Sequence, residues 1–375
     1  MQQKLSRNIV LAVTGWLMLT AIGHSEHVVN RKASLIDVSM RRHELQNNDD
    51  LRVMAALDSL RSCVRLPVVP APIGPMVIVM GYLNGGHGAY NPLFLTQIEV
   101  YQHFEARITA GMNQFLATGS ESEARCAQSQ IDSWAQASAL LDYDPVKYLQ
   151  AYFQVEWTLS SIAISESVLM ADPNLDPAMV ARDIAWMNKV AQKAVNLDKS
   201  VNQHQNHHYW RGLAAVSVGV ISGDDGLFTW GVEVFRSAVD QINSAGAFPL
   251  EMQRDELAIH YQAFALEPLI PLAEFASRQG IDLYSYKSPT GRTISDAMIF
   301  LGNAVENPAL VKPFQPQVQK VDTNSEEFSA SCEFFERRFR GKLPETVNHL
   351  IQHPTFASRV GGSTTVLAAP RRTPQ

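Results

Sequence analysis

Apolar residues recur every three or four positions through most of the chain after residue 92, with polar residues between them. The clearest such stripe consists of Leu95, Ile98, Tyr101, Phe104, Ile108, Met112 and Phe115. This spacing places the apolar side chains on one face of an α-helix. We therefore expect a long first helix that begins near Pro92 and ends at Gly119 and Ser120.

The same pattern predicts a series of further helices, separated by turns rich in glycine, aspartate and proline. The expected helical segments are 123–141, 145–170, 177–195, 206–222, 227–244, 250–279, 294–305, 326–340 and 343–352. Pro268 and Pro271 are expected to kink or split the segment 250–279. No strand-period segment of any length appears, so the sequence predicts an all-α fold.

Around ten helices joined by short turns are expected to pack as successive antiparallel hairpins. Arranged in a ring, such hairpins form an α/α toroid, an incomplete barrel whose inner helices line a central substrate groove. A stacked solenoid or a helix bundle is the competing all-α arrangement. The sequence contains no fixed-length repeat that would favour a solenoid.

The first 25 residues resemble a secretory signal peptide. Lys4 and Arg7 form a short basic region, and an apolar run follows from Ile9 to Ile22. The run is shorter than the ~20 residues that a membrane span needs. We therefore expect a periplasmic or secreted protein with no stable membrane span after processing.

The rest of the chain divides into three parts. Residues 26–62 are polar and charged, and they are expected to form either a spacer or a packed arm. Residues 63–367 contain the helical pattern and form the predicted toroid domain. Residues 368–375 are expected to be a frayed tail.

The net charge of −6 argues against a nucleic-acid partner, because no overall positive charge offsets phosphate repulsion. An acidic polymer remains a possible partner if basic residues gather in a cleft. No Cys/His spacing suggests a metal site, and we expect no cofactor and a monomeric protein. Cys63 and Cys126 could form a disulfide and leave Cys332 free, or all three could be buried thiols.

One short run, Asn206-His207-His208-Tyr209-Trp210, combines an amide, two imidazoles, a phenol and an indole. Its polar residues need partners or solvent, whereas the two aromatic residues favour a buried position. A polar surface turn at the start of a helix is the simpler interpretation. Both interpretations hold if this helix begins at a groove.

Arg254 and Tyr261 form a second candidate pair in the predicted helix 250–279. They are seven residues apart, which is about two helical turns, so they are expected to share one face of that helix. If this face lies near Asn206, one pocket would hold a carboxylate clamp and a phenolic proton carrier. An exposed arginine and a core tyrosine are the alternatives.

A glycine-rich segment, 80–92, contains Tyr82 and His87. Glycines permit a hinge and tyrosines pack against sugar rings, so this segment is either a lid over a ligand or a simple surface loop. Gln150 and Trp157 are expected to share one face of the helix that follows Pro145.

The run 206–210 resembles the Asn-His-Ser-Tyr-Trp signature of polysaccharide lyase family 5, the alginate lyases. Residues 251–266, with Arg254 and Tyr261, are similar to the second motif of that family. The segment 225–233 resembles the intervening motif, and 359–362 resembles the C-terminal Arg-x-Gly-Gly element. The resemblance spans about Cys63 to Val366, and it implies a Cys63–Cys126 disulfide of the kind that some members carry.

This resemblance implies β-elimination on an acidic polysaccharide, either alginate or a related 1,4-linked polyuronate. A proton leaves C5 next to the carboxylate, and the 4-O-glycosidic bond then breaks to give an unsaturated end. Arg254 and Asn206 are expected to neutralise the carboxylate, and Tyr261 is the expected proton carrier. His207 either assists the neutralisation or acts as the base. Arg254 is expected to lower the pKa of Tyr261.

The predicted substrate-binding residues are Tyr82, His87, Gln150, Trp157, His208, Tyr209, Trp210, His260 and Arg359. Gly81 precedes Tyr82 where some members carry a cation, and His208 and His260 stand where the compared members have small residues. Substrate range and pH optimum are therefore expected to differ from those of other members. A non-catalytic polysaccharide-binding protein is the alternative function. A glycoside hydrolase would need two opposed acids, and none stands out in these motifs.

Overall fold

The computed structural model describes residues 26–84, 88–201, 205–325 and 327–370. The predicted signal peptide and His87 lie outside these residues. Within the described part of the chain, none of the helices combines the length and the apolar character that crossing a membrane requires.

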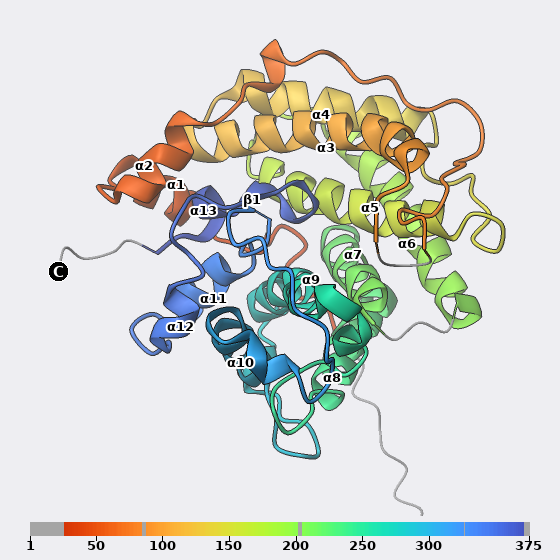
Figure 1. Ribbon diagram of the computed structural model, residues 1–375. Coiled ribbons are helices and arrows are strands. Elements are labelled where there is room, and N and C mark those ends of the chain that lie inside the picture. Colours follow the sequence, from red (N-terminus) through yellow and green to blue (C-terminus); the bar gives the residue numbers. More distant parts are fainter. Residues whose placement is uncertain (1–25, 85–87, 202–204, 326, 371–375) are drawn as a thin grey trace, which may run out of the picture.

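The regular secondary structure is almost entirely helical, which confirms the all-α prediction (Figure 1). The helices are α1 Val38–Gln46, α2 Leu51–Asp58, α3 Pro92–Thr118, α4 Glu121–Gln136, α5 Leu149–Leu169, α6 Pro177–Val201, α7 Asn206–Ser222, α8 Asp225–Asp240, α9 Ala258–Arg278, α10 Ile294–Glu306, α11 Cys332–Arg338, α12 Glu345–Asn348 and α13 Thr364–Ala368. Two short strands, β1 Phe356–Ala357 and β2 Gly362–Ser363, pair antiparallel with Phe356 opposite Ser363.

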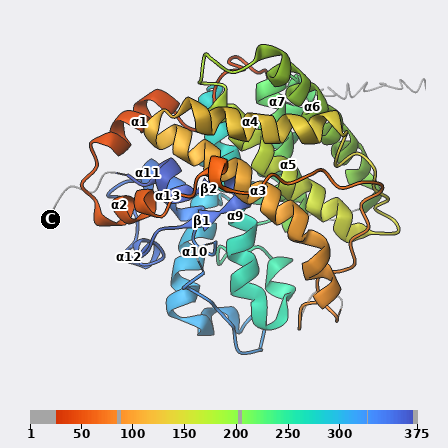
Figure 2. The same cartoon turned by 90° about the horizontal axis from the view of Figure 1, so that it is seen from above.

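The long helices form an α/α toroid made of an inner and an outer set. Helix α5 buries every residue from Gln150 to Leu169, and α7 is buried along nearly its whole length. Helices α4 and α8 instead bury one face and expose the other. Neighbouring helices pack in the pairs α3–α4 and α7–α8, and α5 and α9 both contact α7 (Figures 1 and 2). The inner helices therefore carry the residues that can face a central cleft.

Local capping explains where the first long helix begins and ends. The side chain of Asn91 accepts a hydrogen bond from the backbone N–H of Leu93, and Pro92 occupies the first helical position. Gly119 ends α3 with φ 77°, a left-handed conformation that glycine adopts without strain.

A Cys63–Cys126 disulfide joins the segment before α3 to α4, and Cys332 is free and buried. The predicted pairing is therefore confirmed.

Several predicted helix boundaries are wrong, and three of the errors concern whole turns of the chain near the cleft or the C-terminal region. The helix expected from Pro145 begins at Leu149, because the carboxylate of Asp144 accepts the N–H groups of the next residues and closes a separate turn. The segment expected as helix from residue 250 forms two 3-10 turns before α9 starts at Ala258. Within the described part of the predicted helix 326–340, which starts at residue 327, the only helix is the short α11. Pro268 and Pro271 lie inside α9 and do not divide it.

The described part of residues 26–62 packs against the domain. Arg41 of α1 is buried, and its guanidinium donates to the backbone carbonyls of Thr365, Val366 and Ala369 at 2.7–2.9 Å. Helix α2 also contacts α13. This segment is therefore an arm that ties the start of the chain to its C-terminal helix, as the proximity of α1, α2 and α13 in Figure 2 shows.

Candidate active site

A cleft of about 450 Å³ lies among α3, α5, the start of α7 and the start of α9. A volume of this size suits a ligand-binding site. Its lining residues are Met80, Gly81, Tyr82, Tyr90, Phe94, Leu95, Ile98, Gln102, Leu149, Gln150, Phe153, Trp157, Gln205, His207, Arg254, His260, Tyr261, Phe264, Glu327 and Arg359. The two motifs that are about fifty residues apart in the sequence therefore face the same space.

His207 enters the cleft from the first turn of α7. Its ring stacks on Phe153 with the centroids 3.4 Å apart, and its Nδ1 lies 2.5 Å from Oε1 of Glu156. Arg211, one turn further along α7, donates to Oε2 of Glu156 at 2.8 Å. We assign the ring proton to Nδ1, because each oxygen of Glu156 then receives one donor. The other nitrogen, Nε2, is left as an acceptor.

A buried ionic network supports His207 from behind. Arg211 also donates to Asp198 at 2.7 Å, and Nδ1 of His208 lies 3.0 Å from the same carboxylate oxygen. Burial raises the pKa of Glu156, and the positive charge of Arg211 opposes that shift. Burial also lowers the pKa of His207 well below its usual value, so its imidazole is neutral near pH ~7.

Arg254 and Tyr261 are neighbours in the cleft, although not for the predicted reason. Arg254 lies between two 3-10 turns with φ −100° and ψ 34°, outside α9. The prediction that both residues share one helix is therefore wrong. The turn instead folds the guanidinium over the Tyr261 ring, with its carbon 4.4 Å from the ring centroid. Oε1 of Gln205 accepts a hydrogen bond from Nη2 of Arg254 at 2.5 Å and fixes this orientation.

The pKa of Tyr261 is raised, contrary to the sequence prediction. Burial is the largest cause of the shift, and a hydrogen bond with Tyr82 and the charge of Arg254 only partly offset it. Arg254 therefore acts in the predicted direction but does not dominate. In the free protein Tyr261 is a neutral phenol that can donate a proton, and its phenolate forms at alkaline pH.

Two tyrosines at the ends of the glycine-rich segment lie over the cleft. The rings of Tyr82 and Tyr90 stack with centroids 4.7 Å apart, and the hydroxyl groups are 3.3 Å apart. Gln150 accepts a hydrogen bond from the backbone N–H of Gly81 at 3.2 Å, which connects this segment to α5. Burial raises the pKa of Tyr82 to about 12. The sequence analysis missed Tyr90, although its place at the far end of the predicted lid was a usable signal.

A second arginine, Arg359, lies across the cleft next to two aromatic rings. Its guanidinium carbon is 4.3 Å from the centroid of Trp157 and 5.5 Å from that of Phe264. Nη1 of Arg359 donates to Oε1 of Glu327 at 3.0 Å. His260 also lines the cleft, and burial lowers its pKa.

Asn206 does not line the cleft in this structure. Its side chain is fully buried, and both its backbone N–H and its amide nitrogen donate to Glu251, at 2.8 and 2.9 Å. To contact a substrate carboxylate, its amide would have to leave Glu251. That role stays a prediction.

The prediction that His208, Tyr209 and Trp210 bind substrate is corrected by their position in α7. His208, Tyr209 and Trp210 are buried outside the cleft, so they are not placed to contact substrate there. The physical reason is helical phase: successive residues of α7 point about 100° apart, and only His207 turns toward the cleft. Tyr209 packs near Phe248 in the core, and His208 contacts the network around Asp198.

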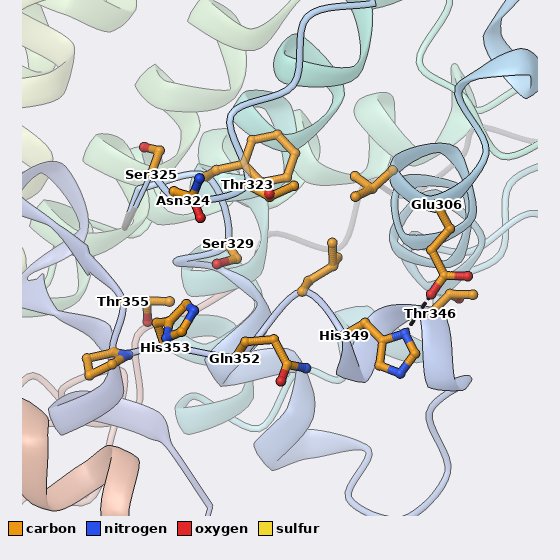
Figure 3. A pocket seen from close by; sticks show the side chains of 14 residues that line it. Glu306, Thr323, Asn324, Ser325, Ser329, Thr346, His349, Gln352, His353 and Thr355 are labelled. Carbon is orange, nitrogen blue, oxygen red and sulfur yellow. Dashed lines mark hydrogen bonds and ion pairs between the residues drawn. The ribbon is translucent and has the colours of Figure 1, made fainter.

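A separate cavity of about 360 Å³ lies between α10, α12 and the segments 323–325 and 328–329 (Figure 3). Glu306 and His349 face each other there at 2.7 Å. Among its described lining residues there is no arginine, lysine or tyrosine. It therefore offers no fixed positive charge for an acidic sugar. Across the described ranges, no cluster of three or more His, Cys, Asp or Glu side chains could hold a metal ion.

Comparison with known proteins gives consistent matches to lyases. The alginate lyase family model matches residues 83–311. A polysaccharide lyase from Stenotrophomonas maltophilia (strain K279a) is 28% identical over 226 residues, which cover 58% of this chain and 68% of that protein. An alginate lyase from Azotobacter vinelandii (strain DJ) is 25% identical over 285 residues, covering 72% and 73% of the two chains.

Solved structures agree with these matches. Alginate lyase A1-III, in a tyrosine-to-phenylalanine variant complexed with a tetrasaccharide, superposes with a TM-score of 0.85 and 38% identity. The match covers 93% of this chain and 98% of that one. An alginate lyase from Bacteroides ovatus, at 15% identity and a TM-score of 0.67, shares the fold. The chain with the cleft described above therefore belongs to the alginate lyase family, polysaccharide lyase family 5.

Proposed function

We propose that this polysaccharide lyase cleaves mannuronate-containing polyuronates by β-elimination in the cleft lined by His207, Arg254 and Tyr261. One observation carries the proposal: a guanidinium stacked on a buried phenol faces the same space as a neutral imidazole. The similar A1-III enzyme binds a tetrasaccharide as a tyrosine-to-phenylalanine variant and as a histidine-to-alanine variant. A lyase that uses a tyrosine and a histidine, such as Tyr261 and His207 of this cleft, would likewise bind an oligosaccharide.

Arg254 supplies the positive charge that the reaction needs. Removal of the C5 proton builds negative charge on the uronate carboxylate, and a fixed guanidinium stabilises that charge without reorganisation. Gln205 orients Arg254 through its carbonyl oxygen and adds no competing charge. The C5–H electrons form the C4–C5 double bond, and the bond from C4 to the glycosidic oxygen breaks.

Tyr261 carries the proton in this proposal. In mannuronate the C5 proton and the C4 oxygen lie on the same side, so one phenolate can take the first proton and return it to the leaving oxygen. The charge of Arg254 and a hydrogen bond with Tyr82 favour the phenolate, whereas burial opposes it. His207 also lines the cleft and leaves Nε2 as a neutral acceptor, and in this proposal it is the base for a C5 proton on the opposite face.

The test is to incubate the protein with polymers of mannuronate, guluronate and glucuronate and with hyaluronan across pH. The ultraviolet absorbance of the unsaturated product measures turnover, and absence of a rise with every polymer would reject the proposal. Tyr261→Phe should nearly abolish turnover but retain binding of a mannuronate tetrasaccharide. Tyr143→Phe is the matched control, because that buried hydroxyl lies outside the cleft and has no hydrogen-bond partner within the described structure.

We also propose that the protein works in the periplasm or outside the cell as a monomer. The Cys63–Cys126 disulfide supports export, because such bonds persist in oxidising compartments. Cell fractionation and sedimentation velocity test the two statements separately.

A further inference from the structure

Arg359, one of the two arginines in the cleft, donates a hydrogen bond to a carboxylate of the protein, whereas Arg254 has only a longer ion pair of 3.8 Å with Glu251. Glu327 lines the cleft and accepts a hydrogen bond from Arg359 at 3.0 Å. The Glu327 side chain is 45% exposed, whereas that of Arg359 is 22% exposed. A carboxylate at the surface of a cleft for a polyanion repels the ligand, so its presence requires an explanation.

The position of Arg359 is fixed independently of Glu327. Its guanidinium lies over the Trp157 ring and near Phe264, and both rings line the same cleft. Other acidic groups near Arg359 are Glu105 and Glu267, which are both buried and whose pKa values burial raises. Glu327 is therefore the carboxylate beside Arg359 that a ligand can reach and displace.

We propose that Glu327 is a specificity-determining residue that occupies the place on Arg359 where a flanking uronate carboxylate would bind. A carboxylate of the polymer must displace Glu327 and then lie close to it. A neutral sugar hydroxyl can instead accept from Arg359 and donate to Glu327 with the ion pair intact. The protein thus disfavours a second carboxylate at this position. This inference rests on the proposed function, because it requires the polymer to lie in this cleft.

The steady-state test compares Glu327→Gln with the native protein on polymannuronate. Partly exposed ion pairs are weak, so KM should fall by roughly three- to tenfold. The kcat should stay the same, because the flanking contact is remote from the reacting bond. Glu345→Gln is the matched control, since it makes the same charge change at a side chain that is 85% exposed and outside the cleft. An unchanged or higher KM for Glu327→Gln would overturn the inference.

A double variant separates direct competition from a general charge effect. Arg359→Gln alone should raise KM, and adding Glu327→Gln to it should lower KM by a clearly smaller factor than in the native background. If Glu327→Gln lowers KM by the same factor with and without Arg359, the carboxylate acts only through long-range repulsion. That result would also contradict competition for Arg359.

Binding measurements keep this inference separate from the proposed chemistry. Calorimetry with a mannuronate tetrasaccharide, in the Tyr261→Phe background, measures affinity without turnover. Binding tightened by Glu327→Gln supports the competition even if the native protein forms no unsaturated product, in which case only the lyase proposal fails. Turnover by the native protein combined with unchanged or weaker binding by Glu327→Gln refutes the competition and leaves the lyase proposal standing.

Discussion

Glu156 is the residue whose replacement should disturb the reaction centre without touching the substrate. It is fully buried on α5, and its two oxygens contact His207 at 2.5 Å and Arg211 at 2.8 Å. Glutamine at this position keeps the shape but offers one acceptor oxygen and one NH₂ group. If the oxygen stays on Arg211, the NH₂ group faces Nδ1 of His207. The ring must then carry its proton on Nε2, which removes the acceptor from the cleft.

The expected magnitudes follow from these contacts. Breaking a buried ion pair costs about 3–5 kcal/mol, and the lower end applies because Arg211 keeps Asp198 at 2.7 Å. We therefore expect Glu156→Gln to lower the free energy of unfolding by about 3 kcal/mol. Loss of the correct histidine tautomer should reduce kcat by roughly a hundredfold or more. KM should change little, because Glu156 does not line the cleft.

Three measurements on folded Glu156→Gln test this reasoning. Product absorbance gives kcat and KM, urea unfolding gives the stability, and ¹⁵N chemical shifts show which ring nitrogen of His207 holds the proton. Glu166→Gln is the control, because Glu166 lies on the same helix, is fully buried, and has its pKa raised to about 8 by burial. Its carboxyl is mostly protonated at neutral pH, so an amide changes little. Native kcat in Glu156→Gln would refute the positioning role.

Further predictions concern pH and packing. The value of kcat/KM should rise with pH into the alkaline range, because burial raises the pKa of Tyr261 and the proposed base is its phenolate. A profile that is flat above neutral pH would instead favour His207 as the base, because its pKa is lowered. Replacing Cys63 and Cys126 by serine should lower the free energy of unfolding by about 4 kcal/mol in urea titrations, given their sequence separation of 63, and a loss near zero would contradict this. Gly212→Ala should lower stability by about 1–3 kcal/mol, because its Cβ would lie 2.7 Å from a valine methyl of α8; an unchanged melting temperature would contradict this close packing.

Helix positions were predictable because periodicity is a local property of the sequence. The non-helical conformation of the segment around Arg254 could not be predicted in this way. Asp255 has φ 47°, which no helical pattern signals. The backbone N–H of Lys320 donates to the carbonyl of Glu256 at 2.7 Å, and Gln319 donates to the carbonyl of Asp255 at 3.0 Å. These partners lie about sixty positions away. A tertiary contact therefore replaced the local preference for helix.

The candidate site was predictable only as far as its motifs extended. The run 206–210 pointed to the correct turn of α7, but its helical phase decided that only His207 faces the cleft. Glu156 and Glu327 were missed because both lie outside the recognised motifs. Glu156 did carry a usable signal, since a carboxylate in the apolar surroundings of α5 must be paired when buried.

The different partners of the two cleft arginines explain how a chain with a net charge of −6 can attract a polyanion. Arg254 donates a hydrogen bond to a neutral amide and lies over an aromatic ring, and its ion pair with Glu251 is long, so much of its charge remains available at the proposed reaction centre. Its nearest acidic neighbour, Glu251, is 3.8 Å from Nε and accepts both hydrogen bonds of Asn206. Asn206 therefore shares the carboxylate that also faces Arg254, whereas Glu327 pairs directly with Arg359. The less neutralised of the two guanidinium groups therefore lies beside Tyr261, where the proposed reaction places the carboxylate of the reacting sugar.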